Sequence, residues 1–173
     1  VFSSRYTILE EIGKGGMGIV YKAEDTVLNT VVALKVIHPL HSNNPNMIKR
    51  FKQETLLARS VSHENVVRIH DIGEYQGMFY LTMDYIQGQN LRQKIRSRGP
   101  LPIPQVIDYA GQICRALDAA HQNDIIHRDL KPQNILIDKN DRILVSDFGL
   151  AKSLASDDTT IPEGIVGTPA YMS

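Results

Sequence analysis

The pattern of the chain changes near residue 88, and this change most limits what it can fold into. Before it, short β-branched or aromatic runs of strand length are separated by Gly, Asn or Asp, at residues 5–13, 18–25, 31–37, 65–75 and 77–86. One helical pattern, at residues 46–59, interrupts them. After it come helical patterns at 89–99 and 104–122, then two short strands at 134–138 and 142–146. This order predicts an α+β protein with a β-rich lobe, a link and a helical lobe.

Composition excludes several classes of protein. The 173 residues can bury a core in one domain or two small lobes. Lys+Arg and Asp+Glu both number 19, so charge indicates neither a nucleic-acid nor a membrane partner. No apolar run approaches the ~18 residues of a membrane span, and the sequence shows no signal-peptide pattern. The chain begins without Met and stops abruptly, so we expect a piece of a longer protein.

The chain has a single cysteine, Cys114. It cannot form an internal disulfide framework, which indicates a reducing compartment and a cytoplasmic location. A membrane tether elsewhere in the whole protein stays open. Because Cys114 lies in an apolar helical stripe with Ile107, Ala110, Leu117 and Ala120, we expect a buried packing thiol.

Lys35 stands inside the apolar run "VVALKVI". A lysine left in such a strand without a partner costs about 3–5 kcal/mol. The helical segment offers a partner, because Glu54 falls in its apolar stripe with Met47, Phe51 and Ala58. Pairing Lys35 with Glu54 would resolve both burials, although two separate snorkelling charges remain an alternative.

The segment "IGKGGMGIV" carries Gly13-x-Gly15-x-x-Gly18. A dinucleotide fold needs a helix next and an acid about 20 residues later, but a strand pattern follows and "VVALKVI" has no acid. A P-loop needs Gly-Lys-Ser/Thr, which is also missing. The remaining interpretation is a strand–loop–strand lid whose glycine backbone can approach phosphates. A plain flexible turn is the alternative. If the segment is such a lid, Lys35 would contact the same phosphates from below.

Two later stretches carry chemistry. "IIHRDLKPQNILI" places Asp129, Lys131 and Asn134 within six residues, and "VSDFGLA" adds Asp147. Two carboxylates, a carboxamide and a lysine suit Mg²⁺ and a transferring phosphoryl group. Solvated loop acids are the alternative, but each stretch adjoins a short apolar strand that would hold its polar groups in place.

Together these motifs resemble the protein kinase family, in the family's order and over essentially the whole chain: "GKGGMGIV", "VALK", "HRDLKPQN" and "DFG". "GGMG" and "SHENVVRIHDIG" resemble bacterial, eukaryotic-like (Hanks-type) Ser/Thr kinases. The resemblance implies a bilobal kinase fold with ATP between the lobes: N-lobe 1–83, hinge 84–88 and a partial helical C-lobe 89–173. The chain departs from the family by stopping within the activation segment, before the helices that support the catalytic loop.

The resemblance also implies roles. Lys35 would hold the α/β-phosphates and pair with Glu54. Asp129 would orient the acceptor hydroxyl and take its proton, and Lys131 would offset γ-phosphate charge. Mg²⁺ would be held by Asn134 and Asp147. The nucleotide would contact Ile12, Gly13, Lys14, Gly15, Gly16, Met17, Gly18, Val20, Ala33 and Leu136, the gatekeeper Met83, and backbone groups of Asp84 and Ile86. For the apolar members of this set, plain core packing is the alternative.

Lys131 and "GTPAYM" imply serine and threonine acceptors on protein substrates. In the family, an arginine at Arg128 pairs with a phosphorylated residue after "DFG". Thr159 and Thr160 are the expected sites of autophosphorylation through kinase–kinase contact, whereas Thr168 resembles the substrate-docking loop. Small-molecule kinases share the fold but match these motifs less well. A non-catalytic nucleotide-binding or scaffold module stays open, because the rest of the C-lobe is absent.

Overall fold

The computed structural model describes residues 2–15, 18–37 and 45–148, without the side chains of residues 45–47 and 50. The chain divides into two compact units. Unit 1 comprises Val1–Arg59 and Arg68–Tyr85, and unit 2 comprises Ser60–Val67 and Ile86–Ser173. The expected lobe limits at residues 83 and 89, with a hinge at 84–88, stay a prediction. Several expected site residues lie outside the described residues: Gly16, Met17, Thr159, Thr160 and Thr168.

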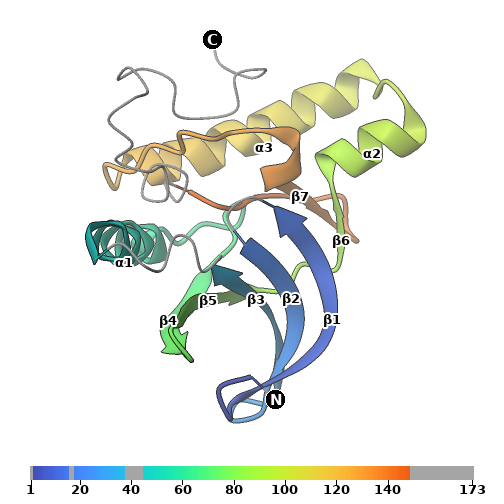
Figure 1. Ribbon diagram of the computed structural model, residues 1–173. Coiled ribbons are helices and arrows are strands. Elements are labelled where there is room, and N and C mark those ends of the chain that lie inside the picture. The colour runs from blue at the N-terminus through green and yellow to red at the C-terminus, as the bar shows by residue number, and fades with distance from the viewer. Residues whose placement is uncertain (1, 16–17, 38–44, 149–173) are drawn as a thin grey trace, which may run out of the picture. The chain divides into compact units, whose positions relative to one another are not determined.

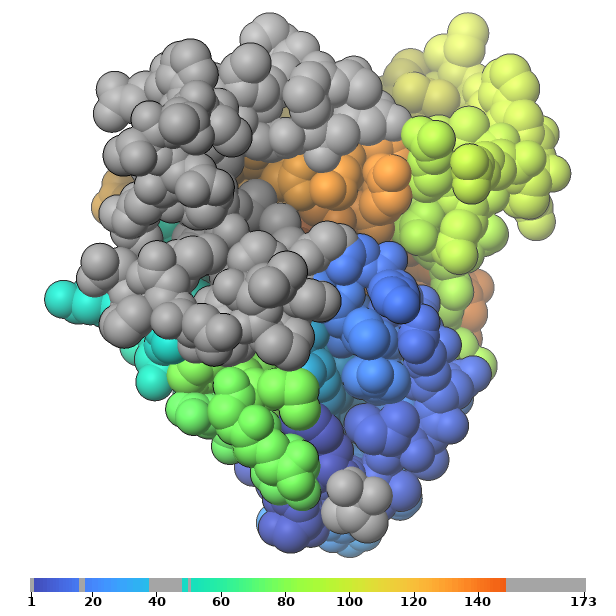
Figure 2. Space-filling model, in the orientation of Figure 1, coloured from blue at the N-terminus to red at the C-terminus, as the bar shows by residue number. Residues whose placement is uncertain are grey.

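Unit 1 is built on an antiparallel five-stranded sheet of order β1-β2-β3-β5-β4 (Figure 1). The strands are β1 (Tyr6–Gly15), β2 (Gly18–Asp25), β3 (Thr30–Ile37), β4 (Ile69–Tyr75) and β5 (Met78–Asp84). Helix α1 (Pro45–Ser60) belongs to the same unit. The edge strand β1, in blue, lies at the surface (Figure 2), and its Leu9 is half exposed. This part of the α+β expectation is confirmed.

The sheet of unit 1 has two distinct faces. Tyr6, Ala23, Val32 and Leu34 form a buried apolar cluster on one face. Successive side chains of a strand point to opposite faces, so the odd-numbered residues of β3 project from the other face. Phe79 of β5 is on this second face, because it lies two residues before Leu81, the partner of Lys35. The Nζ atom of Lys52 lies 4.8 Å from the ring centroid of Phe79, so α1 packs on the second face.

The described part of unit 2 combines two α-helices with a small antiparallel sheet. The helices are α2 (Leu91–Arg98) and α3 (Ile103–His121), and a 3-10 helix, η2 (Pro132–Asn134), precedes the second strand. The sheet has the order β6-β7-β8, formed by β6 (Gly88–Asn90), β7 (Ile135–Asp138) and β8 (Ile143–Val145). Tyr109 of α3 packs in a buried cluster with Ile135, Ile137 and Ile143.

Two expectations about local structure are wrong. The strand expected over residues 65–75 begins only at Ile69, because the preceding residues pair with β8. The N–H of Val67 donates to the carbonyl of Val145 at 2.9 Å, and the N–H of Val145 donates to Asn65 at 2.8 Å. Residues 60–67 therefore join unit 2.

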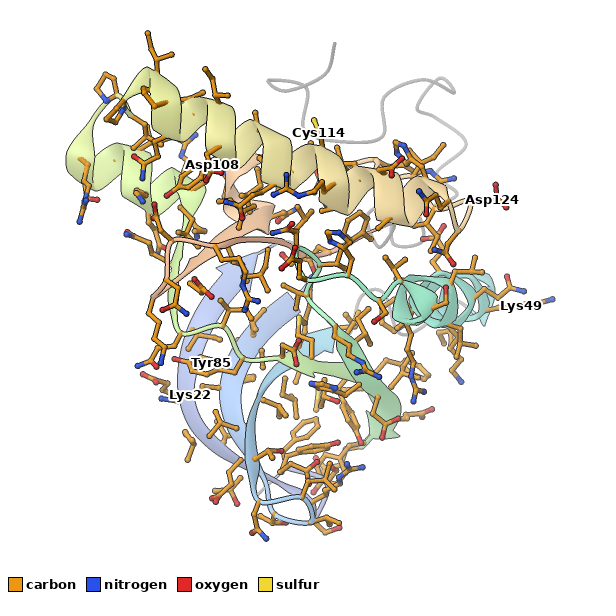
Figure 3. All side chains as sticks on the ribbon, turned by 180° about the vertical axis from the view of Figure 1, so that it is seen from behind. Lys22, Lys49, Tyr85, Asp108, Cys114 and Asp124 are labelled. Atoms are coloured by element: carbon orange, nitrogen blue, oxygen red, sulfur yellow. The ribbon has the colours of Figure 1, made fainter. Side chains whose placement is uncertain are left out.

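Cys114 is exposed rather than buried, and in Figure 3 it points away from α3. The helix buries Tyr109, Gln112, Ala116 and Ala120, so of the expected stripe only Ala120 is fully buried, while Ile107 and Ala110 are exposed like Cys114. Gln112 can be buried because its side chain has hydrogen-bond partners within the unit. Among the described residues, no helix is long and apolar enough to cross a membrane.

Candidate active site

Four of the residues expected at a nucleotide site project from one face of the unit 1 sheet. In the strand register, Val20 is the partner of Lys35 and Ala33 is the partner of Met83. Cross-strand partners share a face, as do residues two apart in one strand. Lys35 is only 5 % exposed, as the apolar run predicts. The register thus brings one buried cation and three apolar side chains together.

The β1–β2 hairpin carries the glycine-rich segment. Gly13 is the partner of Val20, and Gly15 is the partner of Gly18. Gly18 has φ +149°, and a Cβ atom there would lie 2.0 Å from the carbonyl oxygen of Val36, so this position requires glycine. A Cβ at Gly15 would meet nothing within 4 Å. Ile12 and Lys14, also expected at the site, are exposed.

Glu54 lies in helix α1, which packs on the face of the sheet that carries Lys35. Phe51 and Ala58 of the expected apolar stripe are buried. Glu54 itself is half-buried, and its Oε2 atom is fully enclosed. The Lys35–Glu54 pair stays a prediction, which this shared face supports.

The end of unit 1 and the start of unit 2 hold the residues expected to bind the adenine through their backbone. The N–H of Asp84 donates to the carbonyl of Arg68 at 3.0 Å, so a nucleotide would use the carbonyl of Asp84 instead. The neighbouring Tyr85 lies under Lys22, whose Nζ atom is 5.0 Å from the ring centroid (Figure 3). Ile86 is half-buried. The half-buried Leu136 lies in β7.

In unit 2, the loop between α3 and β7 brings Asp129, Lys131 and Asn134 together. The Nζ atom of Lys131 lies 2.6 Å from Oδ2 of Asp129. The Nδ2 atom of Asn134 donates to the Asp129 carbonyl oxygen at 2.9 Å. Asp129 is 7 % exposed, so its carboxylate is held in a largely enclosed place by η2 and the lysine.

His127 was missed by sequence reasoning, although it follows two isoleucines in a run that reads as buried. It is 3 % exposed, and its Nε2–H donates to the carbonyl of Ser146 at 2.9 Å. The N–H of Asp129 donates to its Nδ1 atom at 3.3 Å. Burial lowers the pKa of His127, so the neutral ring carries both hydrogen bonds. The imidazole therefore links the backbone of Asp129 to that of Ser146, which directly follows β8.

Ser146 also joins the loop that holds Asn134 to the segment that carries Asp147. Its N–H and its hydroxyl donate to the carbonyl of Asn134, at 2.9 Å and 3.2 Å. Since Asp147 follows directly in the chain, Asn134 and Asp147 occupy adjacent places. Asp147 and Arg128 both have φ +63°, in the left-handed region. For residues other than glycine this backbone costs on the order of 1–3 kcal/mol each, which the surrounding contacts must offset.

A second support of the loop involves residues that sequence reasoning did not single out. Asn65 is 2 % exposed, and its Nδ2 atom donates to Oε1 of Gln112 at 3.1 Å and to the carbonyl of Ile143 at 2.7 Å. The same Oε1 atom accepts from the N–H of Ile143 at 2.8 Å. These bonds fix β8, two residues before Asp147. The sequence signal for this support was the polar character of Asn65 and Gln112, which stand among apolar residues in a loop and a helix.

The residues expected to bind Mg²⁺ suit that ion. Mg²⁺ prefers hard oxygen ligands and usually keeps several waters and substrate phosphates beside one or two protein groups. Asn134 turns its Nδ2 atom toward Asp129, which leaves the amide oxygen as its metal-binding atom. Asp147, which follows Ser146 in the chain, would add a carboxylate. When bound, the ion would neutralise charge on the nucleotide phosphates.

Comparisons with known proteins identify the family of the chain. Residues 6–173 match the protein kinase domain family. The chain is 42 % identical over 171 residues to the serine/threonine-protein kinase PrkC of Bacillus subtilis, covering 99 % of this chain and 26 % of PrkC. It is 40 % identical to the probable serine/threonine-protein kinase PknB of Lactococcus lactis, covering 100 % of this chain and 28 % of that protein. The chain thus spans about a quarter of these curated relatives.

A solved structure shows the same fold. The crystal structure of the Mycobacterium tuberculosis PknI kinase domain aligns with a TM-score of 0.78 at 34 % identity. The alignment covers 87 % of this chain and 62 % of the chain in that structure. The expected kinase-like α+β fold is therefore confirmed. From its motifs, its fold and these relatives, the chain belongs to the protein kinase family and is homologous to the bacterial Hanks-type Ser/Thr kinases.

Proposed function

We propose that this chain carries the catalytic residues of an ATP- and Mg²⁺-dependent kinase that phosphorylates serine and threonine hydroxyls of proteins. The observation that carries the proposal is the enclosed Asp129 carboxylate, with Lys131 at 2.6 Å and Asn134 donating to its backbone carbonyl. This arrangement supplies a base, a cation and a metal ligand within one short loop. The names of the relatives support protein substrates with serine or threonine acceptors.

The proposed reaction assigns one task to each group. Asp129 orients the acceptor hydroxyl and takes its proton. The hydroxyl oxygen forms a bond to the γ-phosphorus while the bond from that phosphorus to the β–γ bridging oxygen breaks, and ADP leaves with the electron pair. Lys131 stabilises the charge on the transferring group. Lys35 holds the α/β-phosphates, and Glu54 holds Lys35.

The nucleotide is proposed to rest against the Lys35 face of the unit 1 sheet. Val20, Ala33 and Met83 project there beside the buried lysine. The glycine-rich hairpin would cover the phosphates with backbone N–H groups. Asn134 and Asp147 would hold Mg²⁺. A cytoplasmic location for this part of the protein stays a prediction, based on its single cysteine.

A transfer assay on the full-length protein, with ATP, Mg²⁺ and a serine/threonine-rich protein acceptor, tests the proposal. Lys35→Met and Asp147→Asn should each remove most activity while leaving circular dichroism unchanged, because each changes a charge that acts on phosphate or metal. Lys49→Met is the matched control, because Lys49 is exposed on α1 (Figure 3). Wild-type turnover in either site variant would contradict the assigned roles. Nucleotide binding without transfer in the wild type would indicate a non-catalytic module instead.

A further inference from the structure

Lys94 of α2 is a second buried lysine, and the proposed reaction does not use it. It is 4 % exposed. Its Nζ atom lies 2.6 Å from Oδ1 of Asp141 and also donates to the hydroxyl of Tyr109. The Tyr109 hydroxyl donates to the same Asp141 oxygen at 2.5 Å, and Gln105 donates to Oδ2 of Asp141 at 2.9 Å. Every polar group at the centre of this network is therefore engaged.

The network keeps its charges. The hydrogen bond from Lys94, followed by that from Tyr109, lowers the pKa of Asp141 to about 2. Burial opposes the charge on Lys94, but its hydrogen bonds to Asp141 and Tyr109 outweigh this and raise its pKa. Near neutral pH the pair is thus ionised, with the lysine buried and the carboxylate of Asp141 exposed.

The network joins three elements at one point. Lys94 comes from α2, Tyr109 and Gln105 come from α3, and Asp141 lies in the turn between β7 and β8. Asp141 has φ +65°, so this turn adopts a backbone that a non-glycine residue rarely takes. The network therefore holds the β7–β8 turn against both helices.

The same hairpin carries the proposed magnesium ligands at its other end. Asn134 immediately precedes β7, and Asp147 follows β8 by two residues. The register pairs Ile135 with Val145 and Ile137 with Ile143. Turn geometry helps set the register of a hairpin, and a change of register moves the residues at its open end relative to each other.

We propose that the Lys94–Asp141 pair is a positioning device for the magnesium ligands. By fixing the β7–β8 turn against α2 and α3, it sets the spacing of Asn134 and Asp147. This inference rests on the proposed function for its consequence in catalysis, but the restraint on the hairpin can be measured separately.

Lys94→Met tests the pair in the full-length protein, because methionine has a similar length and no charge. We expect the Mg²⁺ concentration for half-maximal transfer to rise about tenfold, the lower end of effects seen when residues behind metal ligands are removed. The KM for ATP at saturating Mg²⁺ should stay unchanged. Lys94→Arg should restore most of the magnesium response, because a pocket of about 370 Å³ beside Lys94 leaves room for the guanidinium.

Arg142→Gln is the matched control. It removes an exposed ion pair with Asp138, at 3.2 Å, from the same turn, and it should leave the magnesium response unchanged. A folded Lys94→Met protein with wild-type half-saturation by Mg²⁺ would overturn the proposal, since a lower folded fraction alone reduces the maximal rate only. If Lys94→Met does not fold, Tyr109→Phe removes one hydrogen bond of the network, and it should give a smaller shift in the same direction. An unchanged magnesium response in folded Tyr109→Phe would also overturn the proposal.

Amide hydrogen exchange of residues 143–146 separates this inference from the proposed function. Lys94→Met should speed exchange there more than in β1–β3, and Arg142→Gln should not. If the wild type fails to transfer phosphate, the proposed function fails, and the exchange result still decides whether the pair holds the hairpin. Unchanged exchange in residues 143–146 would show that it does not.

Discussion

Lys131 reaches back two residues so that its Nζ atom lies 2.6 Å from the Oδ2 atom of Asp129. Charge-assisted hydrogen bonds of this length are about twice as strong as neutral ones. The bond fixes the orientation of a carboxylate that is only 7 % exposed. Asp129 is the proposed base, which must be held within hydrogen-bond reach of the proton it takes, and this contact supplies part of that restraint.

Removing the proposed base gives the first prediction. Asp129→Asn should lower kcat by about 10²–10⁴ because the amide cannot take the hydroxyl proton, with little change in the KM for ATP. Steady-state phosphate transfer measures both constants. Asp124→Asn is the control, because Asp124 is exposed and its φ of +58° suits asparagine (Figure 3). A kcat for Asp129→Asn equal to that of the control would exclude this role.

Glu54 is expected to act by holding Lys35. Glu54→Gln keeps the shape of the side chain and removes its charge, so we expect a strong loss of kcat. ATP affinity should fall only modestly, because the glycine-rich hairpin still contacts the nucleotide. Isothermal titration with ADP, beside the transfer assay, separates the two effects. Equal losses of affinity and kcat would argue against this division of roles.

Gly18 gives a prediction about stability. Gly18→Ala should lower the free energy of unfolding by about 1–3 kcal/mol, because its Cβ would lie 2.0 Å from the Val36 carbonyl oxygen and its φ is +149°. Gly15→Ala, in the same hairpin, has open space and should cost less. Thermal denaturation of both variants checks this. Similar melting temperatures would show that the hairpin relaxes around the new methyl group.

His127 predicts a dependence of stability on acid. Its folded pKa lies below the ordinary value of 6.5 because of burial, so the unfolded chain binds the proton more readily. The contribution of the neutral ring is present above about pH 6.5 and is lost as the pH falls toward the folded pKa. Titration of the His127 ring by NMR should give a midpoint below 6.5. In His127→Gln, melting temperatures should depend less on pH in this range.

Regulation is expected in the segment after the magnesium motif, outside the described residues. We expect autophosphorylation at Thr160 first and Thr159 second, since a phosphate adds about −1.5 to −2 charges that Arg128 can bind. Mass spectrometry of the active full-length protein should find phosphate there. The Thr159→Ala/Thr160→Ala double variant should be slow, with Thr168 intact. Full activity of that variant would rule out this switch.

Much of the site was predictable because its residues are close in sequence. Asp129, Lys131 and Asn134 lie in one loop, so their spacing alone brings them together. Lys35 was recognisable as a buried charge because apolar residues surround it in a strand. Such local patterns need no knowledge of tertiary packing.

The supports of the site were not predictable in this way. The Lys94–Asp141 and Asn65–Gln112 contacts each join residues 47 positions apart. Their partners depend on how α2, α3 and β8 pack, which no local pattern encodes. The exposure of Cys114 has the same cause, because the face of α3 that packs is set by the apolar cluster around Tyr109 and by the hydrogen-bond partners of Gln112. The structure thus adds the long-range contacts that hold the site residues in place.

With Asp147 as the proposed magnesium ligand, its left-handed backbone sets stability against activity under selection. Glycine would adopt φ +63° with less strain, and asparagine would tolerate it well. A screen for heat resistance alone would thus enrich glycine or asparagine at this position, and with them proteins that fold better and lack the carboxylate. Any laboratory evolution of this protein toward higher temperature must therefore select for phosphate transfer in the same step.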